Sequence, residues 1–150
     1  MRAFLRMPVA LYRTPLRAAL RFFYVEIEHR GRKSGRVYHT VVDRLHTDDE
    51  TGEIFVTSAW GEKSDWFRNI KAAPSSRISV GRTRFEPIQR FVDFDEALSI
   101  HRKAAEERPL AMRFGFALMN YPFPKTDEDL REISRFMPVV GFCRRESVVD

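Results

Sequence analysis

The fold is decided by one stretch, residues 22–45, which reads FFYVEIEHRGRKSGRVYHTVVDRL. Its first part alternates: Phe23, Val25 and Ile27 are apolar, and the residues between them are polar or amphipathic. That period of two predicts a strand with one buried face. A glycine-bounded turn, GRKSG, follows, and the chain then returns in a second strand. The stretch therefore predicts a β-hairpin with its basic residues gathered at the turn.

The remainder of the chain adds strands and helices around this hairpin. Strands are expected in residues 53–58, 76–91 (two strands around Gly81) and 137–145, and helices in 64–73, 93–107, 109–119 and 126–136. Ser64 or Asp65 is placed to cap the first of these helices, and Pro74 to stop it. Pro87 fits an edge strand or a bulge, because it lacks a backbone N–H. About six strands joined mostly by hairpins, with peripheral helices, predict an α+β fold whose antiparallel sheet curls into a small barrel.

Composition indicates a folded domain with an affinity for anions. The 150 residues are the size of one ordinary domain, so we expect residues 1–150 to form a single unit. Hydrophobic residues make up 43% of the chain, which excludes the disordered class. The formal charge of +5 favours a nucleic acid, a membrane surface or a phosphorylated small molecule as partner. The single cysteine, Cys143, excludes an internal disulfide and fits a cytoplasmic location.

The N-terminal segment, residues 1–22, is basic and amphipathic. It contains five arginines and no acidic residue, and Pro8 and Pro15 are expected to divide it into short pieces. Arginines interrupt its apolar residues throughout, unlike the core of a signal peptide. Such a segment either covers one face of the domain with its basic side in water, the alternative we favour, or lies on anionic lipid.

Three interpretations fit the basic turn at residues 30–36: a tight turn with solvated ends, a nucleic-acid patch, or an anion cradle. The order of residues excludes a Walker A loop, whose lysine follows the second glycine and opens a helix. Gly31 and Gly35 on their own are explained by turn geometry. The turn nevertheless places basic side chains beside the backbone amides of Ser34 and Gly35, and guanidinium groups and amides both match phosphate oxygens. Chemistry alone thus favours a hairpin turn suited to an anion.

The second cluster, SAWGEKSDWFRN (residues 58–69), contains both tryptophans of the chain. Trp60 and Trp66 either hold a planar ligand, or serve as one exposed loop residue and one buried anchor of the helix. Asn69 follows Trp66 by three residues on the same helix face, where its amide can reach a ligand or a neighbouring backbone. The residue pattern leaves both alternatives open.

No residue pattern points to a metal site or to a catalytic nucleophile. The four histidines (29, 39, 46 and 101) lack metal-ligand spacing, and the first two are placed to face each other across the hairpin. The sequence contains neither a nucleophile elbow nor a Cys–His pair, so the catalytic residues stay unknown. An enzyme built on this chain would therefore depend on a bound cofactor for its chemistry.

Three segments in their order along the chain carry a family resemblance. HRGRKSGR, SAWGEKSDWFRNIKAAP and the closing PVVGFCRR together resemble the deazaflavin-dependent nitroreductase family, over about residues 20–145. Members are small oxidoreductases with a split β-barrel fold related to FMN-binding proteins. The resemblance implies that fold here, together with a site for reduced 8-hydroxy-5-deazaflavin (coenzyme F420), whose tail carries a phosphate and several glutamates.

The resemblance also assigns residues of this chain to parts of that site, namely the grip on the tail, the wrapping of the ring, the support of the pocket and the substrate side. The grip on the tail corresponds to Arg32, Lys33, Ser34, Gly35 and Arg36, and the wrapping of the ring corresponds to Ser58, Trp60, Gly61 and Lys63. The support of the pocket corresponds to Trp66 and Asn69, and the substrate side corresponds to Tyr121 and Phe123.

We therefore expect an oxidoreductase that transfers a hydride from the reduced deazaflavin to a quinone, enone or nitroaromatic acceptor. Ser58 or Tyr121 would donate a hydrogen bond to the developing negative charge. The alternatives are an FMN-dependent oxidoreductase of the same fold and a non-catalytic module that binds flavin or nucleic acid. Nucleic acid is disfavoured, because the aromatic residues do not interleave with the basic ones. We expect a cytoplasmic monomer or homodimer, and contact of residues 1–22 with an anionic membrane stays open.

Overall fold

Seven strands form the framework of the molecule. The computed structural model describes residues 13–15 and 23–145, so most of the basic segment 1–22, including Pro8, lies outside the described residues. The strands are β1 (Tyr24–Arg30), β2 (Val37–Thr47), β3 (Ile54–Thr57), β4 (Arg77–Val80), β5 (Thr83–Phe85), β6 (Pro87–Phe91) and β7 (Val139–Arg144). The described helices are the 3₁₀ helix η1 (Gly61–Lys63) and the α-helices α3 (Asp65–Ala72), α4 (Phe94–Glu107), α5 (Pro109–Leu118) and α6 (Asp127–Phe136).

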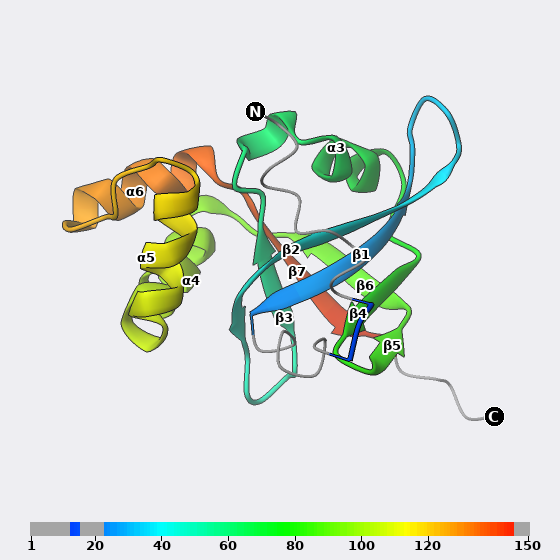
Figure 1. Cartoon of the computed structure of the whole chain (residues 1–150), viewed down its shortest axis with the longest axis horizontal. Helices are drawn as coiled ribbons and strands as arrows, with labels where there is room; N and C mark the ends of the chain where they lie inside the picture. The colour runs from blue at the N-terminus through cyan, green and yellow to red at the C-terminus, as the bar shows by residue number, and fades with distance from the viewer. Residues whose placement is uncertain (1–12, 16–22, 146–150) are drawn as a thin grey trace.

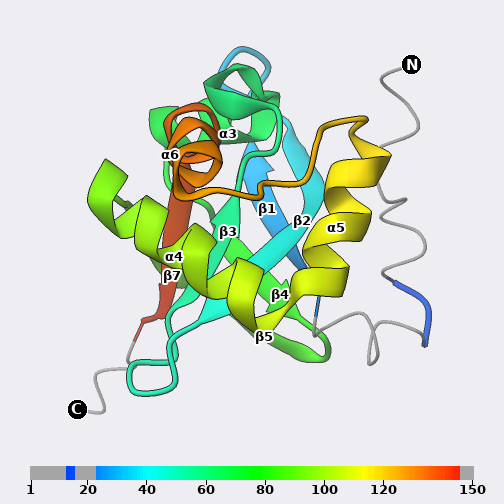
Figure 2. The same ribbon diagram turned by 90° about the vertical axis from the view of Figure 1, so that its left-hand side faces the viewer.

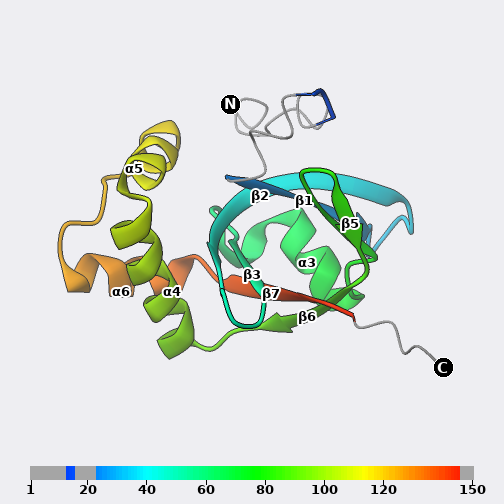
Figure 3. The same ribbon diagram turned by 90° about the horizontal axis from the view of Figure 1, so that it is seen from below.

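The strands form one antiparallel sheet that curls into a nearly closed barrel (Figure 3). Its order is β5-β4-β1-β2-β3-β7-β6. The expected α+β fold and split barrel are confirmed. The sheet has seven strands instead of about six, because the stretch 76–91 contains three: β5 pairs with β4, while β6 pairs with β7. Glu86 is the single residue between β5 and β6, and Pro87 opens the edge strand β6, where no N–H is needed.

The predicted hairpin is present as β1 and β2, which pair from Tyr24 opposite Asp43 to Arg30 opposite Val37. A β-bulge between residues 44 and 46 bends β2, so that its far end pairs with β3. The expectation that Phe23 belongs to the buried face is wrong. Its side chain is 45% exposed, and its ring lies 4.9 Å from the guanidinium of Arg108.

The main core lies inside the barrel. Val25 and Ile27 of β1 are fully buried there, together with apolar residues of β2, β3, β4 and β7. Helix α3 lies across one end of the barrel (Figure 1) and inserts Trp66, Phe67 and Ile70 into the same core. It ends at Ala72, two residues before the predicted stop at Pro74. Helix α3 and the β1–β2 turn therefore lie at the same end of the barrel, where Arg32 of the turn contacts Asn69 of the helix.

Helices α4, α5 and α6 pack together on one side of the barrel (Figure 2). Asp93 caps α4 by accepting a hydrogen bond from the Glu96 N–H at 2.9 Å, and Thr126 begins α6 with a capping box. A second core forms around Phe55 and Ile100, between the sheet and α4, and a small third core around Phe116 and Ile133, between α5 and α6. Among the described residues, no helix combines the length and the apolar character needed to cross a bilayer.

Candidate functional site

The turn between β1 and β2 is closed by its two glycines. The Gly35 N–H donates to Gly31 O at 2.8 Å, and the Gly31 N–H donates to Arg36 O at 2.8 Å. Gly35 has a φ of +69°, and a Cβ at Gly31 would lie 2.6 Å from Ser34 Oγ. Residues 32–36 are all exposed. The glycines thus permit a compact loop that presents basic residues to solvent.

Arg32 is held against α3, unlike the other basic residues of the turn. Its guanidinium donates to Asn69 Oδ1 at 2.9 Å and to Asp65 Oδ1 at 3.2 Å. Its backbone N–H donates to the same Asn69 oxygen at 3.1 Å. Within the described part of the chain, Lys33 and Arg36 form no ion pair. Arg32 therefore fixes the turn relative to α3, and the side chains of Lys33 and Arg36 are free to bind an anion.

Asn69 connects Arg32 to a buried histidine. Asn69 is 5% exposed, and its Nδ2 lies 3.1 Å from His29 Nδ1. Because Asn69 Oδ1 accepts from Arg32, Nδ2 is the donor and His29 Nδ1 the acceptor. His29 Nε2 then carries the proton and donates to Thr40 Oγ1 at 3.0 Å. Burial, with a smaller contribution from the neighbouring His39, lowers the pKa of His29 to about 4, so the ring is neutral at pH 7, as this hydrogen-bond pattern requires.

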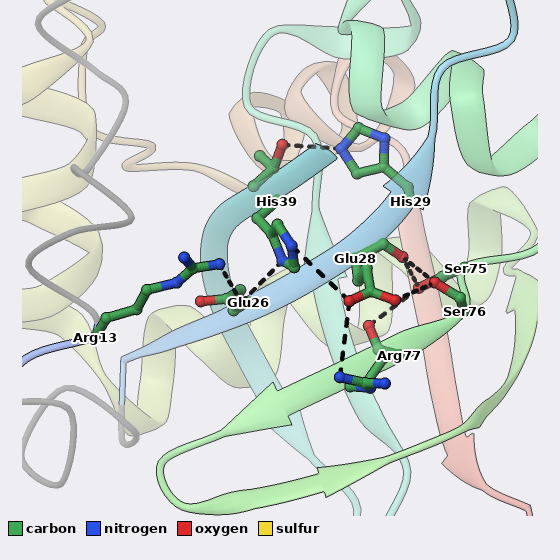
Figure 4. A network of polar contacts seen from close by, with 9 residues as sticks. Arg13, Glu26, Glu28, His29, His39, Ser75, Ser76 and Arg77 are labelled. Carbon is green, nitrogen blue, oxygen red and sulfur yellow. Dashed lines mark hydrogen bonds and ion pairs between the residues drawn. The ribbon is translucent and has the colours of Figure 1, made fainter. Parts of the chain in front are cut away.

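The opposite face of β1 carries a polar network that strand alternation did not predict (Figure 4). Glu26, expected to face water, is 9% exposed, and its Oε1 lies 3.0 Å from His39 Nδ1. The other imidazole nitrogen lies 3.8 Å from Glu28, and an arginine approaches each carboxylate. In the hairpin His39 lies opposite Glu28, whereas Tyr38 lies opposite His29. The expectation that the two histidines face each other is therefore wrong: they lie on opposite faces of the sheet.

The loop after β3 is closed by Ser58. Its side chain is fully buried, and its hydroxyl lies 2.6 Å from Gly61 O and 2.8 Å from the Ser64 hydroxyl. Gly61 has a φ of +72°, and a Cβ there would lie 3.0 Å from the backbone oxygen of Phe136 at the end of α6. The close approach and the left-handed backbone both require glycine at this position. The loop is consequently fixed against α6, and the Ser58 hydroxyl is engaged inside it.

The two tryptophans lie in different environments. Trp66 is 8% exposed and belongs to the barrel core, with its ring perpendicular to that of Phe67 at 5.8 Å. Trp60 is 52% exposed, and Lys63 on the same loop is exposed as well. The structure thus contains one buried anchor of α3 and one exposed loop residue, the second of the two alternatives drawn from the sequence. Trp60 offers a free aromatic face next to Gly61.

Tyr121 and Phe123 belong to the helical layer and not to the turn or the β3 loop. The Tyr121 ring lies 5.9 Å from that of Phe116, and the Phe123 ring lies 6.2 Å from the same residue. The Arg113 guanidinium stacks on Phe123 at 4.9 Å. Tyr121 is 42% exposed. The structure therefore divides the predicted residues into a pair that follows α5 and a larger set around α3. We name the larger set the α3 group; it consists of residues 32–36, Ser58, Trp60, Gly61, Lys63, Trp66 and Asn69.

Two contributors to the α3 group were absent from the predicted set. His29 has the same strand parity as Val25 and Ile27, so alternation alone places it on the inward face. Its partner Asn69 lies 40 residues away in sequence. Asp65 had been considered only as a helix cap, and no local signal connects it to Arg32.

Family comparison matches the region that contains this arrangement. Residues 23–112, more than half of the chain, match the sequence profile of the family described as F420H(2)-dependent quinone reductase. The chain belongs to that family. The match includes the β1–β2 turn, the loop with Trp60 and helix α3, and it ends within α5 before Tyr121 and Phe123 are reached. The matched range thus contains the predicted residues around α3 but not Tyr121 and Phe123.

One relative of this family member comes from Mycobacterium tuberculosis (strain ATCC 25618 / H37Rv). It is Rv3178, named as a candidate F420H(2)-dependent quinone reductase, and it is 37% identical over 68 residues. The aligned part covers 44% of this chain and 55% of Rv3178. The chain therefore spans about half the length of this relative.

Solved structures with the same fold include two that differ strongly in sequence. An F420-H2 dependent reductase (FDR-A) is 18% identical, with a TM-score of 0.50 over 79% of this chain and 92% of that one. The conserved hypothetical protein Rv2991 from Mycobacterium tuberculosis is 19% identical, with a TM-score of 0.51 over 86% of this chain and 80% of that one. At these identities the likeness is one of fold.

Proposed function

We propose that this member of the F420H(2)-dependent quinone reductase family binds reduced F420 and catalyses hydride transfer to a quinone-type acceptor. One observation carries the proposal. Lys33 and Arg36 are exposed and unpaired among the described residues, on a turn that Arg32 and Asn69 hold beside α3. A fixed loop with free cations suits a polyanionic tail, because little conformational entropy is lost when the tail binds.

The residues at this end of the barrel fit the two ends of such a cofactor. Lys33 and Arg36 match its phosphate and carboxylates, while the exposed ring of Trp60 offers a surface on which a flat ring can stack. Lys63 adds a further cation, which lies on the Trp60 loop. The bound cofactor would supply the hydride. The protein would bind the tail, orient the ring and exclude water from the acceptor.

On the acceptor side, we propose Tyr121 as the hydrogen-bond donor in preference to Ser58. The Ser58 hydroxyl is fully buried and engaged with Gly61 and Ser64. Tyr121 is 42% exposed, and among the described residues its hydroxyl has no hydrogen-bond partner. A free phenol can donate to an oxygen that gains negative charge during reduction. Phe123 would bound the acceptor pocket next to it.

The proposal is tested by titrating the protein with F420 species of different tail lengths and following fluorescence. The double variant Lys33→Ala/Arg36→Ala should weaken binding by on the order of tenfold to a hundredfold, and most strongly for the longest tail. Arg82→Ala/Arg84→Ala is the matched control, because it removes two exposed arginines from the β4–β5 hairpin. Equal losses in both variants, or tighter binding of FMN than of F420, would contradict the proposal.

The assignment of the reaction needs its own measurement. Oxidation of reduced F420 in the presence of a soluble quinone should depend on the protein and saturate with quinone. Tyr121→Phe should lower kcat while leaving F420 affinity unchanged, since it removes only the phenol. If kcat stays at the wild-type value, Tyr121 is not the donor.

We propose a cytoplasmic location, in which residues 1–22 cover the domain and turn their basic side to water or to an anionic membrane surface. The five arginines of this segment and its lack of acidic residues suit either environment. Removal of residues 1–20 should reduce pelleting with vesicles that contain phosphatidylglycerol. Unchanged pelleting would exclude a role for this segment in membrane contact.

A further inference from the structure

The barrel has a second end, opposite the end that α3 covers, and a cavity opens there. Strand β3 begins at this end and runs towards the Trp60 loop, while β4 and β7 finish here; α3 lies at the top of Figure 1, and Figure 3 views the molecule from the second end. The cavity has a volume of about 590 Å³. We name it the far-end cavity, and its lining side chains are Thr51, Ile54, Val80, Thr83, Phe85 and Arg144. Its volume lies in the range of pockets that hold small organic ligands, about 300–1,000 Å³.

The far-end cavity is apolar inside and polar at its rim. Ile54 is 8% exposed and belongs to the main core of the barrel. Val80 and Phe85 are half-buried and pack against the same core. The exposed side chains, which form the rim, are Thr51, Thr83 and Arg144. An apolar interior with a few polar groups at the mouth is the usual construction of a site for a small molecule that carries one polar group.

Arg144 is the single charged residue of the lining. Its guanidinium lies 5.5 Å from the centroid of the Phe85 ring. Among the described residues Arg144 forms no ion pair, and the carboxylate of Glu86, next to Phe85 in sequence, pairs with Arg145 at 3.3 Å instead. A guanidinium that rests on an aromatic ring keeps its N–H groups free to bind a carboxylate through two hydrogen bonds. The cavity therefore combines an apolar interior with one free cation.

We infer that the far-end cavity binds a small aromatic acid, with the carboxylate of the ligand on Arg144 and its ring against Ile54, Val80 and Phe85. The carboxylate matches the planar fork of the guanidinium. A flat ring can stack with the aromatic ring and guanidinium already present, and it loses less conformational entropy on binding than a flexible chain does. The hydroxyl of Thr83 at the rim adds a further donor for the carboxylate.

This site goes beyond the proposed function and does not depend on it. The lining shares no residue with the α3 group, with Tyr121 or with Phe123. A ligand in the far-end cavity would nevertheless cover the same core into which α3 inserts Trp66, because Ile54 belongs to that core. A ligand that binds only the native state stabilises it, so binding at this end should raise the melting temperature of the whole barrel.

The test titrates the full chain with 2-naphthoate and follows the fluorescence of the naphthalene ring, without F420. Wild-type protein should bind it saturably, with a dissociation constant below about 1 mM, and its melting temperature should rise. Arg144→Gln should weaken binding by on the order of tenfold, and it should leave binding of the uncharged methyl ester unchanged. Arg84→Gln is the matched control and should have no effect. Arg84 is an exposed arginine of β5, and strand alternation directs its side chain away from the face that carries Thr83 and Phe85.

A second variant tests the interior of the cavity. Val80→Phe narrows it and should weaken binding of the acid and of the ester alike. Circular dichroism verifies that the variants fold, and Arg144→Gln decides alone if Val80→Phe does not, because Arg144 is exposed.

Four results would overturn the inference. Wild-type protein that shows no saturable binding has no such site, and equal losses in Arg144→Gln and Arg84→Gln indicate non-specific attraction to a basic surface. Octanoate that binds as tightly as 2-naphthoate would exclude the preference for aromatic acids. Displacement of 2-naphthoate by F420 would place the probe at the α3 end of the barrel. F420 titration of Arg144→Gln should match wild type, so failure of this inference and failure of the proposed function are read separately.

Discussion

Substitution of Asn69 by alanine tests the connection on which the candidate site depends. Asn69 Oδ1 accepts from both the backbone and the guanidinium of Arg32, and Asn69 Nδ2 donates to His29. The variant removes all of these contacts at once while leaving the exposed cations of the turn in place. We expect the turn to detach from α3, since among the described residues the remaining polar contact between them is the ion pair of Arg32 with Asp65.

The size of the effect follows from burial. His29 is 3% exposed, and without Asn69 its Nδ1 is a buried acceptor with no donor, which costs about 1–3 kcal/mol. The Arg32 N–H loses a partner in a half-buried place, and the truncated side chain leaves a small void, so the sum is about 2–4 kcal/mol. Asp65→Asn is the matched control on the same helix. Its side chain is 72% exposed, and its loss should cost less than about 1 kcal/mol.

Urea unfolding measures the stability term, and titration with long-tailed F420 measures the effect on the site. Asn69→Ala should lower both the unfolding free energy and the F420 affinity, whereas Asp65→Asn should change each only slightly. Two results would refute the reasoning. One is an Asn69→Ala variant as stable as wild type; the other is a destabilised variant that binds the tail with unchanged affinity, because Arg32 would then not need its anchor.

Three further predictions concern pH, the β3 loop and the tryptophans. The pKa values of His29 and His101 lie at about 4, below the 6.5 of the unfolded chain, so the unfolded state takes up protons first and the unfolding free energy falls as the pH drops from about 6.5 to about 4. The loss is about 3 kcal/mol for His101, and His101→Asn should remove part of this slope in urea titrations; a slope identical to wild type would show that His101 does not contribute. Gly61→Ala should lower the melting temperature by several degrees, because its backbone is left-handed and its Cβ meets the end of α6; an unchanged melting temperature contradicts the close approach. Trp66→Leu should cost about 2–4 kcal/mol and Trp60→Leu less than about 0.5, and a large loss at Trp60 would show that its exposed ring carries stability.

Local patterns in the sequence predicted most of the framework. Alternation and the two glycines located the β1–β2 hairpin, and Pro74 located the end of α3 to within two residues. The number of strands was underestimated at Pro87. A proline in an edge strand is also compatible with the chain leaving one neighbouring strand and pairing with another. Here β5 pairs with β4 and β6 pairs with β7, and β7 is far from β6 in sequence, so local patterns did not indicate the change.

The sequence predicted which residue types form the candidate site, but not which of these residues contact one another. The basic turn and the Trp60 loop were visible as motifs. The contact of Arg32 with Asn69 joins residues 37 apart, and its support by His29 required knowledge of which face of β1 meets α3. Glu26 shows that alternation also failed to predict the burial of a charged side chain. Alternation placed it in water, yet the imidazole of His39 and a nearby arginine allow its carboxylate to be covered.

The single residue between β5 and β6 affects the tendency of the protein to aggregate. These strands are the two free edges of the sheet, and Glu86 joins them directly. While that link is intact, neither edge can move far from the other to recruit a strand from another molecule. Proteolytic cleavage at Glu86 would release both edges together and favour aggregation. Cleavage in the exposed loop at residues 49–52 would leave them joined and the protein dispersed.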